Sequence, residues 1–213
     1  MAYSHYKNIK KVVEKFNIQV ERGFIFSNEN IKPIEPSEWL KQTIYRAEIL
    51  GYYSEKERSE RLVNPVLTEL VGIYDGQITL YSGQELNIDK DLTGECDYLL
   101  TLGRKVIDYV STPLFSIVEA KRQDMEHGTA QCTAQMLGAI QYNKRDGIEL
   151  PYLYGATTDG QKWRFLKFKN NLLTIHDSYF FLDNLPMLLG VLKHLVEDCK
   201  TFKIEKKQAA AIG

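Results

Sequence analysis

Two carboxylates and one amine stand out as the residues able to do chemistry. Glu119 and Lys121 end an apolar segment at residues 114–118, and Asp97 begins an earlier one. Alternate side chains of a strand share a face, so Glu119 and Lys121 are expected to point the same way and Ala120 the opposite way. Glutamate and lysine are rarely buried unless they are paired, so this position needs a physical explanation.

A divalent cation would supply that explanation. If the strands that carry Asp97 and Glu119 pair, the two carboxylates meet at one end of a sheet, where they repel each other unless a cation lies between them. Mg²⁺ prefers oxygen ligands and binds through one or two carboxylates while keeping several waters. Lys121 could then orient or deprotonate an attacking water, or stabilise charge that develops on a phosphate.

A simpler interpretation of the same residues stays open. The pattern of an Asp followed by Glu-x-Lys arises by chance in many chains, and Glu119 with Lys121 could be an exposed pair on an edge strand, worth little energetically. The apolar segment before Glu119 and the glutamine-containing helix after Lys121 favour the metal site.

The surrounding sequence predicts the elements that must position these residues. Segments with a period of two, separated by turn residues, indicate strands at 18–26, 77–85, 95–102, 114–121, 152–157 and 162–169, with a further pair near 172–181. Apolar spacing and capping signals indicate helices at 5–16, 37–50, 54–70, 129–142 and 185–199. Ser54 and Glu57 have the spacing of a capping box, and Pro65 predicts a kink or break near Asn64.

These elements predict one α/β domain with a mixed central sheet flanked by helices. We expect residues 1–53 to form an N-terminal helical and strand addition packed on a core at 54–204, and residues 205–213 to be a frayed tail. The 213 residues suit a single domain.

Composition narrows the class of protein. The 27 basic and 28 acidic residues give a net charge of −1, which argues against a polycationic nucleic-acid binder but not against a local basic groove. The cysteines at 96, 132 and 199 form no CxxC pair, so reduced thiols are expected and a structural zinc site is not. No segment is apolar over roughly 18 residues, and the N-terminus lacks the apolar core of a signal peptide, so a soluble, cytoplasmic protein without a membrane partner is expected.

Asp97 followed by Glu119-Ala120-Lys121 resembles the PD-(D/E)XK motif of the restriction-endonuclease-like nucleases, with Cys96 where the motif has Pro. More specifically, the chain is similar to the nuclease domain at the N-terminus of type I restriction-enzyme R subunits. The resemblance spans roughly residues 54–170 and includes an acidic helix before the motif, a helix with glutamines after it and a later strand–turn–strand at 154–165.

The resemblance implies a restriction-endonuclease-like core and an Mg²⁺-dependent endonuclease that hydrolyses DNA with Mg²⁺-activated water, Mn²⁺ being able to replace Mg²⁺. Asp97, Glu119 and the Ala120 carbonyl would hold the metal, and Lys121 would serve the water or the phosphate. Gln135 would steady the site from its helix. Glu60 would be an auxiliary acid; helical spacing suggests that it points inward, although Glu57 and Glu69 are nearby candidates.

Further residues are candidates for nucleic-acid contacts if their surface borders the cleft: Arg122, Gln131, Lys162 and Arg164. The outer face of a half-buried strand is the better explanation of the charged side chains at 162–169, and Gln131 equally fits a surface role. DNA is the favoured partner and a homodimer is possible. A catalytically inactive nucleic-acid-binding or assembly module with the same fold is the alternative.

Overall fold

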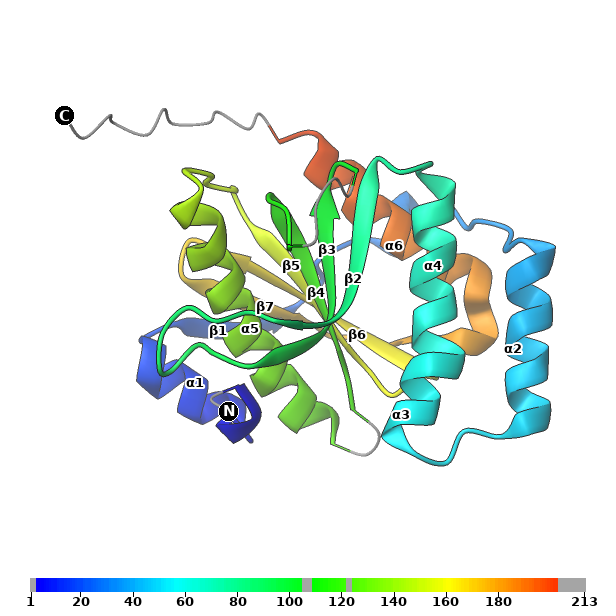
Figure 1. Ribbon diagram of the computed structural model, residues 1–213, viewed down its shortest axis with the longest axis horizontal. Helices are drawn as coiled ribbons and strands as arrows, with labels where there is room; N and C mark the ends of the chain where they lie inside the picture. The colour runs from blue at the N-terminus through cyan, green and yellow to red at the C-terminus, as the bar shows by residue number, and fades with distance from the viewer. Residues whose placement is uncertain (1–2, 105–108, 122–123, 203–213) are drawn as a thin grey trace.

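The computed structural model describes residues 3–104, 109–121 and 124–202. They form a mixed α/β fold in which helices cover both faces of a central eight-stranded sheet (Figure 1). The strands are β1 (Gln19–Gly23), β2 (Ile78–Glu85), β3 (Glu95–Leu102), β4 (Leu114–Ala120), β5 (Leu153–Thr158), β6 (Lys162–Lys169), β7 (Leu172–His176) and β8 (Phe180–Phe181). The helices are α1 (Ile9–Phe16), α2 (Glu38–Leu50), α3 (Glu55–Arg58), α4 (Asn64–Ile73), α5 (Met125–Arg145) and α6 (Leu185–Lys200).

The sheet is ordered β1-β7-β6-β5-β4-β3-β2, and β8 pairs with β6 outside this path. The pairs β4–β5 and β1–β7 are parallel, and the other pairs are antiparallel. The parallel step from β4 to β5 requires a crossover, which α5 supplies. The strands expected from residue 77 onward are therefore confirmed, and α5 extends beyond the expected 129–142 at both ends.

Alternating side chains divide the core into two layers. Val118 of β4 and Phe165 of β6 belong to the layer that contains α4 and α6, whereas Ile117 and Leu166 belong to the layer under α5 and α1. Figure 1 shows α5 and α1 on one side of the sheet and α4, α6 and the outlying α2 on the other. This alternation directs Glu119 toward α5.

The helix that begins after Ser54 has an irregular turn. The expected capping box between Ser54 and Glu57 is confirmed. Instead of a kink at Asn64, residues Ser59–Val63 form a π-helical turn that joins α3 to α4, with Pro65 in the first turn of α4. Proline has no N–H to donate, and a single π-helical turn is one way for a helix to change its hydrogen-bond register.

The first fifty residues are part of the same sheet and its covering layers. β1 forms the edge of the sheet beside β7, while α1 contacts α5 and α2 contacts α4. The expected frayed tail at 205–213 lies outside the described residues. In the part of the chain that the structure describes, no helix is both long and apolar enough to span a membrane.

Gly190 brings α6 against the segment before α2. A Cβ at this position would lie 2.5 Å from the Lys32 carbonyl oxygen and 3.0 Å from the Ile31 side chain, whereas a Cβ on Gly72 of α4 would meet nothing within 4 Å. Because both glycines are helical, replacing either by alanine makes the same change in helix propensity.

We expect Gly190→Ala to destabilise the protein by about 1–3 kcal/mol, because main chain must move to admit the methyl group. Gly72→Ala, the matched control, should be neutral or stabilising by up to about 1 kcal/mol, as helix propensity dictates. Urea-unfolding midpoints measure both effects. Equal shifts in the two variants would contradict the close contact between α6 and Lys32.

Candidate active site

The pairing of β3 with β4 brings Asp97 to the end of β4. Tyr98 lies opposite Val118 in this antiparallel pair, and beyond it the Asp97 carboxylate accepts a hydrogen bond of 2.7 Å from the Ala120 N–H. The structure thus places Asp97 and Glu119 at one end of the sheet.

Glu119 is fully buried, with 0% of its surface exposed. Gln135 of α5 donates a hydrogen bond of 2.8 Å to Glu119 Oε2, and its amide also lies 3.5 Å from the Glu95 carbonyl oxygen. Glu119 Oε1 accepts no hydrogen bond from the described residues, although Lys121 Nζ lies 3.3 Å away. Among the described residues Oε1 is therefore matched by the Lys121 charge alone, which leaves this buried carboxylate less fully compensated than buried polar groups usually are.

Lys121 lies between two carboxylates. Its Nζ is 3.3 Å from Glu119 and 3.2 Å from Glu55 Oε1, in the first turn of α3. Glu55 is half-exposed, whereas only 20% of the Lys121 side chain is exposed. Glu55 could not be identified from the sequence, because no motif spacing links the start of α3 to the end of β4.

Glu60 lines the cleft beside the site but is not buried. Its side chain is 62% exposed and forms an i,i+4 ion pair of 3.8 Å with Lys56. The expectation of an inward side chain is wrong, because it assumed regular α-helical spacing through a segment that is π-helical. The two other acids considered have structural roles: Glu57 closes the capping box, and Glu69 accepts hydrogen bonds from the Ser37 N–H and hydroxyl before α2.

Burial dominates the electrostatics of the site. Burial raises the pKa of Glu119 to about 8, with a further increase from Asp97, against the opposing effects of Lys121 and Gln135. Burial likewise raises the pKa of Asp97. Burial alone would lower the pKa of Lys121, but the surrounding carboxylates, Glu119 first, outweigh it and raise that pKa. The site therefore favours a bound positive charge, whether a proton or a cation.

A cleft of about 380 Å³ opens beside these residues. Helix α3, the start of the π-helical turn and strands β2, β3 and β4 contribute to its lining: Glu55, Lys56, Ser59, Glu60, Ser82, Gly83, Glu95, Asp97, Tyr98 and Ala120. Tyr98 and Ser59 hydroxyls lie 2.8 Å apart, which ties the π-helical turn to the sheet. Asp97 and Glu55 thus line the cleft, whereas Glu119 is buried behind them.

The remaining candidates lie on α5 and β6. Gln131 is buried, and its side-chain oxygen has no hydrogen-bond partner among the described residues. Lys162 is 40% exposed and pairs with Asp159 at 3.9 Å, while Arg164 is only 5% exposed and pairs with Glu126 at 3.0 Å. Arg122 lies outside the described residues. Direct contact of these side chains with nucleic acid stays a prediction.

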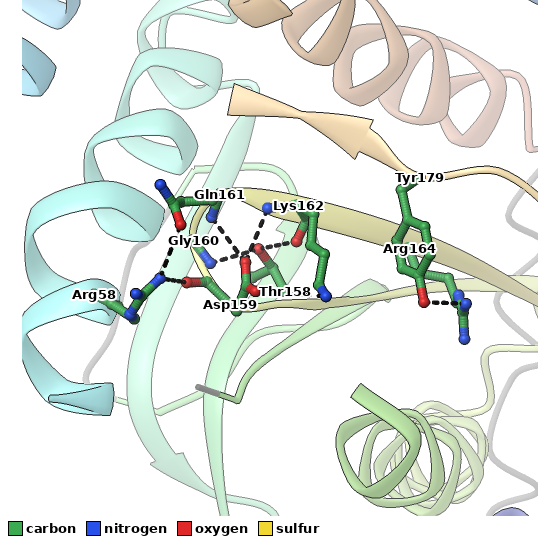
Figure 2. Close-up of polar contacts among 8 residues, drawn as sticks. All are labelled: Arg58, Thr158, Asp159, Gly160, Gln161, Lys162, Arg164 and Tyr179. Carbon is green, nitrogen blue, oxygen red and sulfur yellow. Dashed lines mark hydrogen bonds and ion pairs between the residues drawn. The ribbon is translucent and has the colours of Figure 1, made fainter. Parts of the chain in front are cut away.

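The β5–β6 turn fixes α3 to the sheet. Arg58 donates hydrogen bonds to the Asp159 carbonyl and to Gln161, while Asp159 accepts from the main chain of Gln161 and Lys162 (Figure 2). The Arg58 guanidinium also lies 5.2 Å from the centre of the Tyr52 ring. These contacts position the helix that carries Glu55.

No protein-family model matches the chain, and no curated protein matches its sequence. Function must therefore be inferred from the geometry of this chain's own residues.

We expect the protein, kept free of divalent metal by a chelator, to lose stability as pH rises from about 5 to about 8. In this window the folded state retains a proton on Glu119 that the unfolded state has released. The free energy of unfolding then falls with pH by at most about 1.4 kcal/mol per unit for one group.

Denaturant unfolding at a series of pH values measures this slope. Glu119→Gln should flatten it, because the titrating group is gone, and the exposed Glu60 provides the matched control as Glu60→Gln. A Glu119→Gln profile as steep as that of the unmodified protein would rule out the raised pKa.

Proposed function

We propose that this protein is a divalent-metal-dependent phosphodiesterase that hydrolyses DNA, with a restriction-endonuclease-like core. The observation that carries the proposal is the Glu119 carboxylate. It is wholly buried, only the ion pair with Lys121 matches its Oε1 among the described residues, and its neighbours Asp97 and Ala120 line a cleft.

The donor set fits Mg²⁺. Within the described ranges, no group of three or more His, Cys, Asp or Glu side chains is arranged to hold a metal. A cation here would use Asp97, Glu119, the main chain of Ala120 and water. Mg²⁺, which needs few carboxylates and retains several waters, suits such a set, and Mn²⁺ could replace it.

The protein's own residues would orient the reaction. Gln135 fixes the rotamer of Glu119 through its hydrogen bond, and Asp97 is fixed by the Ala120 N–H. Lys121, kept protonated by the neighbouring carboxylates that raise its pKa, directs a positive charge to the same point, where it would stabilise the phosphate. When bound, Mg²⁺ would neutralise the carboxylates and stabilise the negative charge that develops on the phosphate.

The topology supports the proposed core. β2, β3 and β4 form an antiparallel unit, α5 crosses from β4 to the parallel β5, and the glutamine of this helix reaches the acid of β4. The resemblance implies a mixed central sheet in which a glutamine-containing helix follows the strand of Glu119, and this topology agrees with it.

The second candidate is an inactive nucleic-acid-binding module. The specific observation in its favour is that Lys121 already bridges Glu119 and Glu55, which is a charge network that stands without metal. Calorimetric titration with Mn²⁺ separates the two: binding that Glu119→Ala abolishes counts against the inactive module.

We expect plasmid or single-stranded DNA to be cut in the presence of Mg²⁺ or Mn²⁺. Asp97→Asn and Lys121→Gln should each reduce the rate by about 10²-fold or more, the usual size of a lost catalytic group. Lys10→Gln, on an exposed lysine of α1, is the charge-matched control for Lys121. Cleavage is followed by gel electrophoresis, and equal cleavage rates in all variants would contradict the proposed function.

Glu55, rather than Glu60, should be the auxiliary acid of the site. Glu55→Gln removes a carboxylate from Lys121 and should lower the cleavage rate by about tenfold, with the alkaline limb of the pH profile moved to lower pH, because Glu55 raises the pKa of Lys121. Glu60→Gln should change neither quantity by more than about twofold. Cleavage rates measured over a pH series decide between the two acids. A larger loss of rate in Glu60→Gln than in Glu55→Gln would identify Glu60 as the auxiliary acid instead.

A further inference from the structure

A row of polar side chains leads across the sheet from Glu119. Thr157 of β5 lies opposite Glu119, and Arg164 of β6 lies opposite Thr157. All three are buried under the α5 side of the sheet. Adjacent strands are about 4.8 Å apart, so the main chain at Arg164 is roughly 10 Å from that at Glu119.

Arg164 is an unusual buried charge. Its side chain is 5% exposed and forms an ion pair of 3.0 Å with Glu126. The guanidinium also lies 4.2 Å from the centre of the Tyr179 ring and donates a hydrogen bond to the Tyr179 hydroxyl. Arg164 Nε is buried and has no hydrogen-bond partner among the described residues. A buried arginine is normally matched more completely than this.

The carboxylate that pairs with Arg164 is mostly solvent-exposed. The Glu126 side chain, in the first turn of α5, is 59% exposed and lies 3.6 Å from a second guanidinium, that of Arg22. An oxyanion between two guanidiniums is the arrangement in which arginine recognises phosphate. Because Glu126 is exposed, its displacement by another anion would cost little.

Lys162 adds a third cation to this region. Its Nζ lies 5.5 Å from the centre of the Tyr179 ring. In Figure 2, Lys162 and Arg164 extend from β6 to the same side, with Tyr179 beside Arg164. Arg22, Lys162 and Arg164 face two carboxylates, Glu126 and Asp159, so the cluster has an excess of positive charge.

We propose that Arg164, with Arg22 and Lys162, forms a subsite for a backbone phosphate of a nucleic-acid strand, and that Glu126 fills this subsite in the unbound protein. The inference rests on the proposed function, because it names how the substrate strand would lie. The strand would pass outside the start of α5, which packs closely over Thr157, from the cleft at Asp97 toward Arg164. A phosphate beyond the cleaved one would displace the exposed Glu126.

Binding of a fluorescently labelled single-stranded oligodeoxynucleotide, measured by anisotropy without divalent metal, tests the subsite apart from cleavage. Glu126→Gln removes the competing charge and should tighten binding by about threefold or more, the scale of an exposed ion pair. The slope of log affinity against log salt should become steeper by about 0.7 for each additional phosphate that the protein neutralises. Glu14→Gln on α1 makes the same change in net charge at another exposed ion pair and is the matched control.

Arg164→Gln in the Glu126→Gln background should cancel the tighter binding, with a melting curve that shows whether the variant folds. Equal binding by Glu126→Gln and Glu14→Gln overturns the subsite, as does tighter binding of inorganic phosphate without tighter binding of the oligonucleotide. If Arg164→Gln does not fold, this comparison of the two glutamate variants decides alone. Tightened binding without metal-dependent cleavage would support the subsite and refute the nuclease. Cleavage without tightened binding would support the nuclease and refute the subsite.

Discussion

The burial of the Glu119 carboxylate is the constraint on which the rest of this site depends. A charged oxygen at 0% exposure is tolerated only with donors or a counter-charge at hand. Gln135 supplies one donor and Lys121 one charge, yet the pKa of Glu119 still rises to about 8. The ionised form of Glu119 is therefore less stable in this site than it would be in water. Such a group serves stability poorly and cation binding well.

Close packing between α5 and the sheet makes this burial possible. Gly155 of β5 leaves room for the helix, since a Cβ there would lie 2.6 Å from Met136 Sδ and 2.9 Å from Cys132 Sγ. Near the start of α5, Gly128 allows the same close approach to Thr157 and Lys121. Helix and sheet therefore meet closely enough for a glutamine amide to reach a strand carboxylate. The buried cysteines at 96 and 132 fill this layer and need no redox role.

The sequence allowed the order of elements and the central carboxylates to be predicted, because both depend on local patterns. Period-two segments located β2 to β6, and alternation along β4 separated Glu119 from Val118. Local patterns could not show which of Glu55 and Glu60 lies close to Lys121. Their orientation depends on a π-helical turn and on the contact of Arg58 with the β5–β6 turn, which no local spacing encodes. The alignment of Arg164 with Glu119 needed the register of two successive strand pairs.

The near-neutral charge of the chain acquires a physical meaning from these contacts. Lys121, with 20% of its side chain exposed, pairs with Glu55, and the buried Arg164 pairs with Glu126, so each of these cations is matched by a carboxylate from the first turn of a helix. Both carboxylates are about half-exposed, which makes them easier to displace than the cations they cover. A phosphate could replace either of them without moving the sheet. An overall charge near zero is then compatible with anion recognition, because Lys121 and Arg164 are neutralised by ion pairs with Glu55 and Glu126 that an anion could replace. Affinity would depend on local exchange of one anion for another instead of on a broad basic surface.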